Sequence, residues 1–553
     1  MAEEKVAEEI FKEFKEHSVA EFFRKNRQML GFSGKVRSLT TIVHEYVTNS
    51  LDACEEAGIL PNITVKIEVL PDEHIRVTAE DNGPGIPKEH IGNALGMMLS
   101  GTKFHRYMQQ RGQQGIGASG CTMFAQMTTG KPVHVKSGTG SGTVYECDLS
   151  VDVKTNSPNI SNLTESQDDF RGVSVSAEFA EVKYDKGEHS ALEYLKRTAM
   201  ANPHAQITFI DPDGDRFVFP RAVEEVPERP REVQPHPLGV TTNDLMDWAS
   251  HAEQRKLSSF LNQTFTRMSS AKVDELRSLL PQINFDKNPR ELRWAEAEAI
   301  VKAFQSMRWI APATDSVRPI GQAQIEKALK NVLNPEFLSV RERRPSVYRG
   351  GVPFVIETAI AYGGKAGRPS AAGAVGLDIL RFANRAPLLF DGGGCAITEA
   401  VKSIDWKRYD VKDLENTPIS VFVNIASVFV PYTGAGKQAV ASEEEIITEI
   451  RYGIMEVARD LQRYLSGKIR ESDREAKRKA IMRYVKQLSR DLPELAAAGK
   501  SEEIEKKLVE LVQSKYAKAL EVEEGKEEKG GEEEKEEDIE KEIEEEEGEK
   551  KEE

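Results

Sequence analysis

The chain has 553 residues and a formal net charge of −16, so it is long enough for several domains. Residues 521–553 hold 20 acidic and 6 basic side chains, and without them the chain is close to neutral. No run of eighteen apolar residues predicts a membrane span, and the acidic N-terminus lacks a signal peptide's apolar core. The four cysteines have no disulfide or metal spacing, which favours a reducing cytoplasm.

Residues 1–30 at the start of the chain predict a helical N-terminal arm that carries several phenylalanines. Asp211, Asp213 and Asp215 could be taken for a metal site, but apolar residues on both sides favour a hairpin turn. Residues 223–235 have the composition of a linker. The strands expected before that linker lie at 63–70, 75–80, 132–137, 143–149, 173–180 and 206–219.

The first motif covers residues 45–53 and predicts a helix, because the apolar residues in and around it recur at helical spacing. Glu45, Asn49 and Asp52 are four and three residues apart and therefore share one face. A carboxylate there can take a proton from water, and an amide oxygen suits Mg²⁺, which prefers oxygen ligands. For this helix alone, a solvated polar face is the simpler interpretation.

The second motif begins where a predicted strand ends. Apolar and polar residues alternate over 75–80, and Asp81 follows. A carboxylate at this place can accept a hydrogen bond from an exocyclic amine such as that of adenine, while Gly83 and Gly85 allow the backbone to approach a flat ring. In isolation, an ordinary Asp-Asn-Gly turn explains the same residues.

The third motif, residues 112–120, is a Gly-rich loop that opens a helix. Backbone N–H groups at a helix start bind phosphate, with the helix dipole behind them, although a flexible loop is the alternative. This motif is not a Walker A loop. The nearest match to that pattern ends at Lys437, but it has Pro431 in place of the first Gly and Gln438 after the Lys.

The second half of the chain predicts an α/β domain at 312–466, with its clearest strand at 420–430. A Ser-Glu-Glu-Glu run at 442–445 predicts a capping box that opens a long helix.

The C-terminal part of the chain is charged. Residues 467–520 predict helices that are interrupted near Pro493 and Gly499. The acidic tail, 521–553, predicts disorder or a lone solvated helix.

Taken together, the three motifs resemble the N, G1 and G2 boxes of the GHKL ATPases, a group that includes gyrase, heat-shock chaperones, histidine kinases and MutL. Residues 49–53 narrow the resemblance to gyrase, MutL and topoisomerase VI. The stretches that resemble the topoisomerase VI B subunits more closely are 100–104, 111–117, 381–390 and 431–437.

The resemblance implies an α+β fold with the domains of that family. It places a GHKL (Bergerat) ATPase α/β sandwich at 31–222, a linker with a helix-two-turn-helix-like insert at 223–311, and a transducer at 312–466. It further implies that the arm at 1–30 exchanges between subunits and that residues 467–520 contact an A subunit.

The resemblance also implies roles for single residues. Glu45 would be the general base, Asn49 the Mg²⁺ ligand, and Lys437 the transducer lysine beside the γ-phosphate. Val173 departs from the family, in which a Thr usually supplies a hydroxyl near the phosphates. The residues expected to bind ATP are Asn49, Asp52, Asp81, Gly83, Gly85, Thr102, Lys103, Gly112, Gln113, Gln114, Gly115, Ile116 and Gly117.

The function implied is that of the ATP-hydrolysing subunit of a type II DNA topoisomerase, with ATP and Mg²⁺ as cofactors. ATP would close a dimer of this chain around double-stranded DNA, and a separate A subunit would cleave DNA within a heterotetramer of two A and two B subunits. Two alternatives remain. A MutL-like mismatch-repair ATPase fits less well because the helical insert precedes the transducer, and a chaperone that clamps protein clients would show no DNA-stimulated hydrolysis.

Overall fold

The computed structural model describes residues 27–28, 31–98, 107–112, 117–152, 155–369, 375–434, 436–496 and 500–527. The chain divides into two compact units, Met1–Ala458 and Arg459–Glu553. Within the described ranges, no helix combines the length and the apolar character needed to cross a membrane. The predicted N-terminal arm lies outside these ranges except for Arg27 and Gln28, and so does the acidic tail after Glu527.

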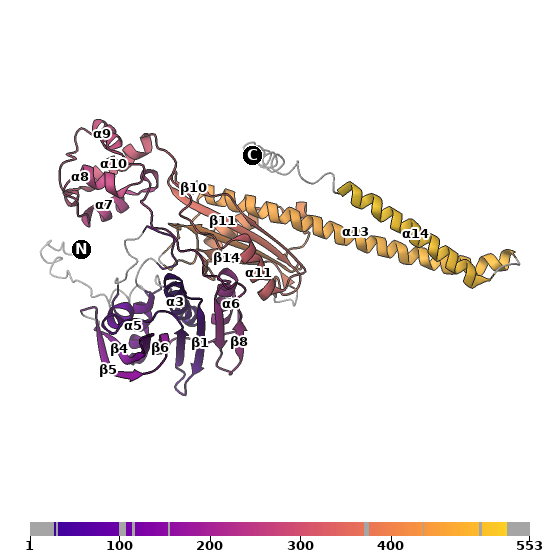
Figure 1. Ribbon diagram of the computed structural model, residues 1–553, viewed down its shortest axis with the longest axis horizontal. Coiled ribbons are helices and arrows are strands. Elements are labelled where there is room, and N and C mark those ends of the chain that lie inside the picture. Colours follow the sequence, from indigo (N-terminus) through magenta and orange to yellow (C-terminus); the bar gives the residue numbers. More distant parts are fainter. Residues whose placement is uncertain are drawn as a thin grey trace, which may run out of the picture. The chain divides into compact units, whose positions relative to one another are not determined.

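The first unit begins with an eight-stranded sheet in the order β5-β4-β3-β6-β2-β1-β7-β8 (Figure 1). Each of the predicted strand positions overlaps an observed strand. In β2, the predicted alternation appears as burial of Ile75, Val77 and Ala79. The strands are β1 (Asn62–Val69), β2 (Ile75–Asp81), β3 (Val133–Thr139), β4 (Thr143–Asp152), β5 (Ser157–Gln167), β6 (Arg171–Phe179), β7 (Gln206–Ile210) and β8 (Arg216–Phe219).

The sequence did not predict β5, which lies at the edge of the sheet and pairs only with β4. Its residues from Asn159 onward are exposed, so the strand lacks the apolar alternation that marks a half-buried strand. A register shift between Glu146 and Asp148 and a left-handed φ of 50° at Asn162 bend this edge. Bulges of this kind protect an open edge against pairing with other chains.

Helices α3 (Lys35–Glu56), α5 (Gly117–Thr129) and α6 (Ala191–Ala201) pack on this sheet (Figure 1). The core between them contains the fully buried rings of Phe179 and Phe209. The smaller helices η1 (Lys88–His90) and α4 (Ile91–Gly96) precede α5.

The acidic run after β7 is a hairpin turn, as predicted. The N–H of Asp211 donates to the carbonyl of Asp215, and β7 pairs antiparallel with β8. Lys186 Nζ lies 3.0 Å from Asp211, 2.9 Å from Asp213 and 3.7 Å from Asp215. Because the ammonium group of Lys186 already lies among the three carboxylates, and no metal-binding group of acidic side chains is found among the described residues, this turn is not arranged as a cation site.

A separate helical cluster follows the linker and has its own core, which includes Phe260, Phe265 and Phe304. Its first long helix starts with a capping box, in which Thr241 and Asp244 bond reciprocally. The elements are η2 (Pro237–Gly239), α7 (Thr242–Ser250), α8 (Leu257–Thr264), α9 (Ser270–Leu279), η3 (Pro289–Glu291) and α10 (Trp294–Ser306). Their assignment to a helix-two-turn-helix module stays a prediction.

A second sheet of six strands completes the first unit, and β11 and β16 at its centre are almost entirely buried. β16 pairs antiparallel with β11 and parallel with β14. The elements of this region are α11 (Gln322–Leu333), β9 (Phe337–Glu342), β10 (Ser346–Tyr348), β11 (Val352–Tyr362), β12 (Arg368–Pro369), β13 (Val375–Gly376), β14 (Asp378–Ala383), β15 (Ala386–Pro387), η4 (Gly392–Gly394), α12 (Ala396–Ser403), η5 (Trp406–Tyr409) and β16 (Ile419–Ser427).

The two sheets exchange core side chains. Leu389 and Phe390, which follow β15, belong to the core of the first sheet. Met200 and Ala201 at the end of α6 belong instead to the core of the second sheet. The guanidinium of Arg37 lies 4.7 Å from the centre of the Phe390 ring, which fixes this contact to the start of α3.

The long helix α13 (Glu444–Ala496) corrects two predictions about the C-terminal region. The expected capping box is absent: the hydroxyl of Ser442 donates to Glu399 at 2.6 Å, and Glu445 accepts from the N–H of Arg349 at 3.2 Å. The helix also continues through Pro493, which therefore does not interrupt it, and ends at Ala496. The next helix begins at Ser501, so the predicted interruption falls in the interval that contains Gly499.

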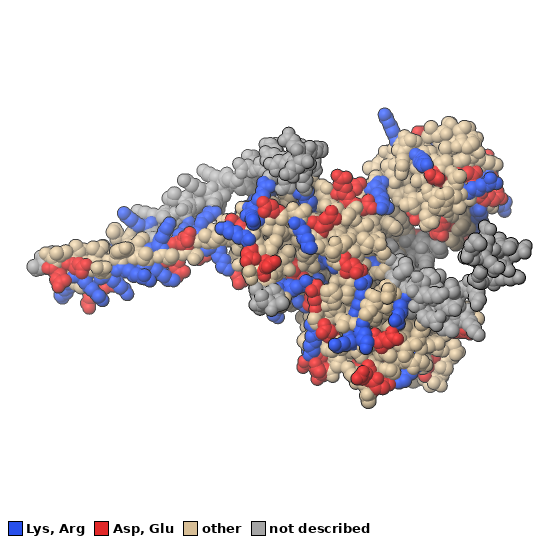
Figure 2. All heavy atoms as spheres, turned by 180° about the vertical axis from the view of Figure 1, so that it is seen from behind, with Lys and Arg blue, Asp and Glu red and all other residues tan. Residues whose placement is uncertain are grey.

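The second unit contains the end of α13 and α14 (Ser501–Glu527). Basic and acidic side chains both lie along the part of these helices that is drawn in colour (Figure 2). The backbone at 521–527 is helical and continues α14, so the start of the predicted tail is helix.

Candidate active site

Helix α3 buries one face and leaves the predicted catalytic residues accessible. Val43 and Val47 are completely buried, whereas Asn49 is exposed and the Glu45 side chain is 28% exposed. Glu45 lies directly against the start of α5, since a Cβ atom added to Gly117 would stand 1.8 Å from Glu45 Oε2. The structure therefore joins the first and third motifs, which the sequence placed far apart.

His44 precedes Glu45 on α3, and its ring lies near the Glu45 carboxylate without carrying a charge. Its Nδ1 is 3.1 Å from the hydroxyl of Tyr194, and its Nε2 is 4.0 Å from Glu45 Oε1. Burial lowers the pKa of His44; the negative charge of Glu45 opposes this effect, and the positive charge of Lys437 adds to it. Because the imidazole is neutral near pH 7, Glu45 and His44 do not form an ion pair at that pH.

Asp81 ends β2 and is held by three donors. Its Oδ2 accepts from the hydroxyl of Ser50 at 2.7 Å, and its Oδ1 accepts from the N–H groups of Gly83 at 2.9 Å and Val173 at 3.2 Å. Burial raises the pKa of Asp81, while these hydrogen bonds oppose that rise. Val173 thus supports Asp81 through its backbone, a contact that needs no side-chain hydroxyl.

Two glycines let the backbone approach closely around Asp81. Gly172 has a φ of 125°, and a Cβ atom there would lie 1.9 Å from the carbonyl oxygen of Asp81. Gly85 has a φ of 75°, and its Cβ atom would lie 2.2 Å from the carbonyl oxygen of Gly138. A side chain at either position would fill this cradle and strain the backbone.

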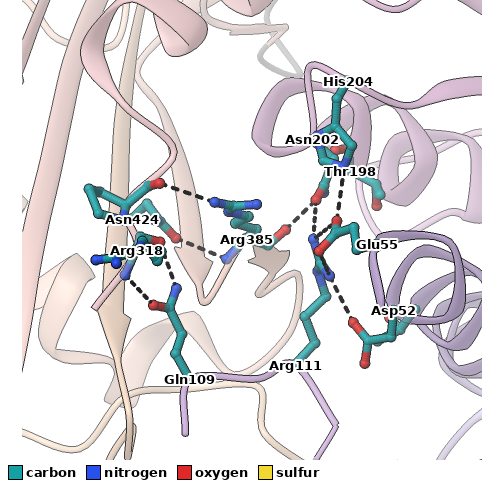
Figure 3. Close-up of polar contacts among 12 residues, drawn as sticks. Asp52, Glu55, Gln109, Arg111, Thr198, Asn202, His204, Arg318, Arg385 and Asn424 are labelled. Atoms are coloured by element: carbon teal, nitrogen blue, oxygen red, sulfur yellow. Dashed lines mark hydrogen bonds and ion pairs between the residues drawn. The ribbon is translucent and has the colours of Figure 1, made fainter. Parts of the chain in front are cut away.

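Asp52 shares a helix with Glu45 but has another partner. Its Oδ1 accepts from Arg111 Nη1 at 2.7 Å, and both side chains are almost completely buried. Arg111 also grips the carboxylate of Glu55 in a two-point contact of 3.0 and 2.7 Å (Figure 3). His204 Nε2 lies 2.9 Å from the same carboxylate.

The charges in this cluster are stable at neutral pH. Burial alone would raise the pKa of Glu55, but Arg111 and His204 hold it well below its usual range. Burial lowers the pKa of His204, so the ring donates to Glu55 as a neutral imidazole. We call Asp52, Glu55, Arg111, Asn202 and His204 the arginine cluster.

Arg111 belongs to a short segment, residues 107–112, which we call the strap. The side chain of Gln109 forms two hydrogen bonds with the backbone of Arg318, at 2.9 and 2.7 Å (Figure 3). Asn384 Nδ2 donates to the carbonyl of Gln110 at 3.2 Å. The strap therefore connects the helix layer of the first sheet with the segment before α11 and with the turn between β14 and β15.

Lys437 reaches the strap from a loop after β16. It adopts a left-handed φ of 49°, and its Nζ donates to the carbonyl oxygen of Arg111 at 3.4 Å. Gly112, the first residue of the predicted phosphate loop, follows Arg111 directly. The ammonium group therefore lies next to the place where that loop begins.

Several predicted ATP-binding residues lie outside the described part of the chain, namely Thr102, Lys103, Gln113, Gln114, Gly115 and Ile116. The structure also places near the site several residues that were not predicted from the sequence. Glu55 stands one helical turn after Asp52, a signal that was available, but nothing in the sequence brings Asn202 or His204 to Arg111.

The described residues contain no group of three or more His, Cys, Asp or Glu side chains that could bind a metal ion by itself. Asn49 is exposed one turn from Glu45 and offers a single amide oxygen. One protein oxygen fits Mg²⁺ that takes most of its ligands from phosphates and water.

Two family models match the chain: the histidine kinase-, DNA gyrase B-, and HSP90-like ATPase at residues 34–153, and the topoisomerase VI B subunit transducer at 312–478. The chain is 45% identical to the type 2 DNA topoisomerase 6 B subunit of Thermococcus kodakarensis, over 94% of this chain and 98% of that protein. This chain belongs to the family of type 2 DNA topoisomerase 6 B subunits. The protein of that name from Methanothermobacter thermautotrophicus is 48% identical, over 85% of this chain and 90% of its own length.

Among solved structures, the ATPase region of Saccharomyces cerevisiae topoisomerase II matches with a TM-score of 0.40 and 10% identity, over 83% of this chain and 99% of that chain.

Membership of the topoisomerase 6 B family confirms the resemblance found in the sequence and sets aside the MutL-like and chaperone alternatives. The matched ATPase region holds α3, β2 and the start of α5, and the matched transducer region holds Arg318, Asn384 and Lys437. In this member of the family, the strap is thus a direct contact between the two matched regions.

Proposed function

We propose that this chain is the ATP-hydrolysing subunit of a type II DNA topoisomerase and that it binds ATP with Mg²⁺ between α3, β2 and α5. One observation carries the proposal. Glu45 contacts the first residue of α5 at Gly117, and Lys437 of the transducer contacts the strap just before the phosphate loop. A base, a phosphate-binding helix start and a cation thereby meet in one region.

Each group has a role in this proposal. Asp81 accepts a hydrogen bond from the exocyclic amine of adenine, and the N–H groups at the start of α5 bind phosphate. Glu45 takes a proton from the water that attacks the γ-phosphate, and Lys437 stabilises the charge on the transferred group. Magnesium, held by Asn49, would neutralise phosphate charge. Asp52 acts indirectly, through Arg111.

Hydrolysis would be used to move DNA. ATP binding closes a dimer of this chain around a captured duplex, and the transducer passes the movement to a separate A subunit that cleaves DNA. The partner complex would contain two A and two B subunits.

The second unit offers a docking surface for that A subunit. Tyr484, Leu488, Leu492 and Leu495 of α13 are 68%, 47%, 42% and 85% exposed, and their spacing places them on one helix face. An exposed apolar face on a charged helix marks a protein contact. We propose that this stripe binds the A subunit.

One experiment tests the function as a whole. ATP hydrolysis is measured with and without supercoiled plasmid, for the natural chain and for Glu45→Ala. We expect DNA to stimulate hydrolysis by the natural chain and Glu45→Ala to lower turnover by about 10²–10⁴-fold, the usual contribution of a general base. The variant should still dimerise with a non-hydrolysable ATP analogue. Hydrolysis that ignores DNA would contradict the topoisomerase role.

A further inference from the structure

The strap has partners along most of its short length, and they come from three directions. The Tyr107 carbonyl accepts from the N–H of Val233 in the linker at 2.9 Å. Gln109 and the carbonyl of Gln110 bond to the transducer, and the Arg111 side chain bonds to α3. Six residues therefore connect the linker, the transducer and the helix that carries Glu45.

The end of the strap at Arg111 is fixed to α3. The guanidinium bonds to Asp52 and Glu55, which follow Glu45 on the same helix by two and three turns. Its Nη2 also donates to Asn202 at the end of α6. Removing one partner from a buried ion pair is costly, so Arg111 and α3 are expected to move together.

The other contacts tie the strap to the transducer. The amide of Gln109 donates to the carbonyl of Arg318 and accepts from its N–H, and Gln109 is only 5% exposed. The carbonyl of Arg111 accepts from Lys437. A movement of the transducer that displaces Arg318 therefore acts on the strap at Gln109, while the end at Arg111, whose carbonyl accepts from Lys437, stays with α3.

A small cleft of about 60 Å³ borders the strap and touches all three of the regions that the strap connects. It is lined by strap residues from Met108 to Arg111, by Asp52, Glu55 and Glu56 of α3, by linker residues from Pro227 to Pro230, and by Asn384 and Arg385. Met108, Gln109 and Arg111 are themselves buried, so the strap is packed between these regions.

We infer that the strap sets the distance between Lys437 and Glu45, with Gln109 and Arg111 as positioning residues that couple the transducer to hydrolysis. The inference rests on the proposed roles of Glu45 and Lys437. It adds that the transducer acts on the ATP site through a second connection besides Lys437 itself. By linkage, a nucleotide bound beside Glu45 and Lys437 would bias the transducer through the same contacts.

The first test replaces Gln109 by methionine, which has a similar shape but cannot form the two hydrogen bonds to Arg318. Turnover should fall by about 10- to 100-fold, because a misplacement of about 1 Å costs up to about 10²-fold. The affinity for ADP, which lacks the γ-phosphate that Lys437 contacts, should stay within about twofold of the natural chain. Gln109→Glu keeps the acceptor for the Arg318 N–H and should give an intermediate turnover.

The matched control is Asn331→Ala. Asn331 Nδ2 donates to the carbonyl of Pro220 at 3.1 Å, so this variant also removes a hydrogen bond between the transducer and the ATPase domain, away from the strap. Its turnover should equal that of the natural chain. Thermal unfolding of all variants shows whether each one is folded.

A double-mutant cycle decides whether Gln109 acts through Lys437. In the Lys437→Ala background, Gln109→Met should lower turnover by less than about twofold, because coupled residues are not additive. If the double variant instead shows the product of the two single-variant losses in turnover, the residues act independently, and the coupling is wrong while the proposed function stands. Normal turnover of Gln109→Met alone would also overturn it. If Lys437→Ala itself hydrolyses ATP normally, the proposed role of that lysine fails, and the coupling fails with it.

Discussion

Gly117→Ala is a sharp test of the active-site geometry, because it moves one carboxylate and changes little else. Gly117 is the first residue of α5, and the three atoms nearest to its missing Cβ all belong to the side chain of Glu45. The clash involves the far end of a flexible side chain rather than backbone. The fold should therefore accept the extra methyl group by displacing the carboxylate of Glu45.

The size of the effect follows from the distances. The new Cβ would stand 1.8 Å from Glu45 Oε2, whereas contacts below 3.0 Å essentially do not occur and 3.4 Å is ordinary. Glu45 must therefore retreat by about 1.2–1.6 Å, and a shift of this size costs on the order of 10²-fold in turnover. Stability should not fall, since alanine is better than glycine in helices by up to about 1 kcal/mol.

The assay compares turnover, ATP affinity and melting temperature for the natural chain, Gly117→Ala and Gly467→Ala. Gly467 is exposed within α13, and a Cβ atom there meets nothing within 4 Å, so it controls for the substitution itself. We expect low turnover with retained ATP binding in Gly117→Ala only. Normal turnover in that variant would refute the placement of Glu45 as the base beside α5.

Three further outcomes are expected. Lys437→Ala should slow hydrolysis far more than it weakens ADP binding, and equal losses of affinity for ADP and a non-hydrolysable ATP analogue would contradict a γ-phosphate contact. Burial lowers the pKa of His204 in the folded chain below its ordinary value of about 6.5, so the unfolded chain takes up the proton first as the pH falls. The natural chain should therefore lose thermal stability between pH 7 and pH 5, and His204→Gln should lose less over the same range. Leu488→Asp in the α13 stripe should abolish ATP-dependent relaxation with an added A subunit while ATP hydrolysis persists, and unchanged relaxation would move the docking site elsewhere.

The sequence predicted those parts of the site that depend on local pattern. The helix of Glu45 and Asn49, the strand that ends at Asp81 and the helix that starts at Gly117 each carry their own periodicity or glycine spacing. The burial of Asp52 could not be predicted, because spacing defines a helix face but does not show which distant side chain covers it.

The contacts between domains were also hidden, for the same reason. The partner of Asp52 is Arg111, 59 residues later, and the partner of Gln109 is Arg318, 209 residues later. The edge strand β5 was missed because its exposed residues show no apolar alternation. The pattern of apolar residues predicts which face of a segment packs on the core, but it does not predict the position of a solvent-exposed segment or its contact with a single distant residue.

The exchange of core side chains between the two sheets limits how this protein can be divided. A fragment that ends after residue 222 would lack Leu389 and Phe390 and would expose the apolar surface on which they pack. Each such side chain contributes about 1.5–3 kcal/mol when buried, so the pair accounts for a large share of the roughly 5–15 kcal/mol that stabilises a typical domain. A chimera that joins this ATPase domain to the transducer of a relative must therefore match these two side chains and also fill the places of Met200 and Ala201 in the opposite core.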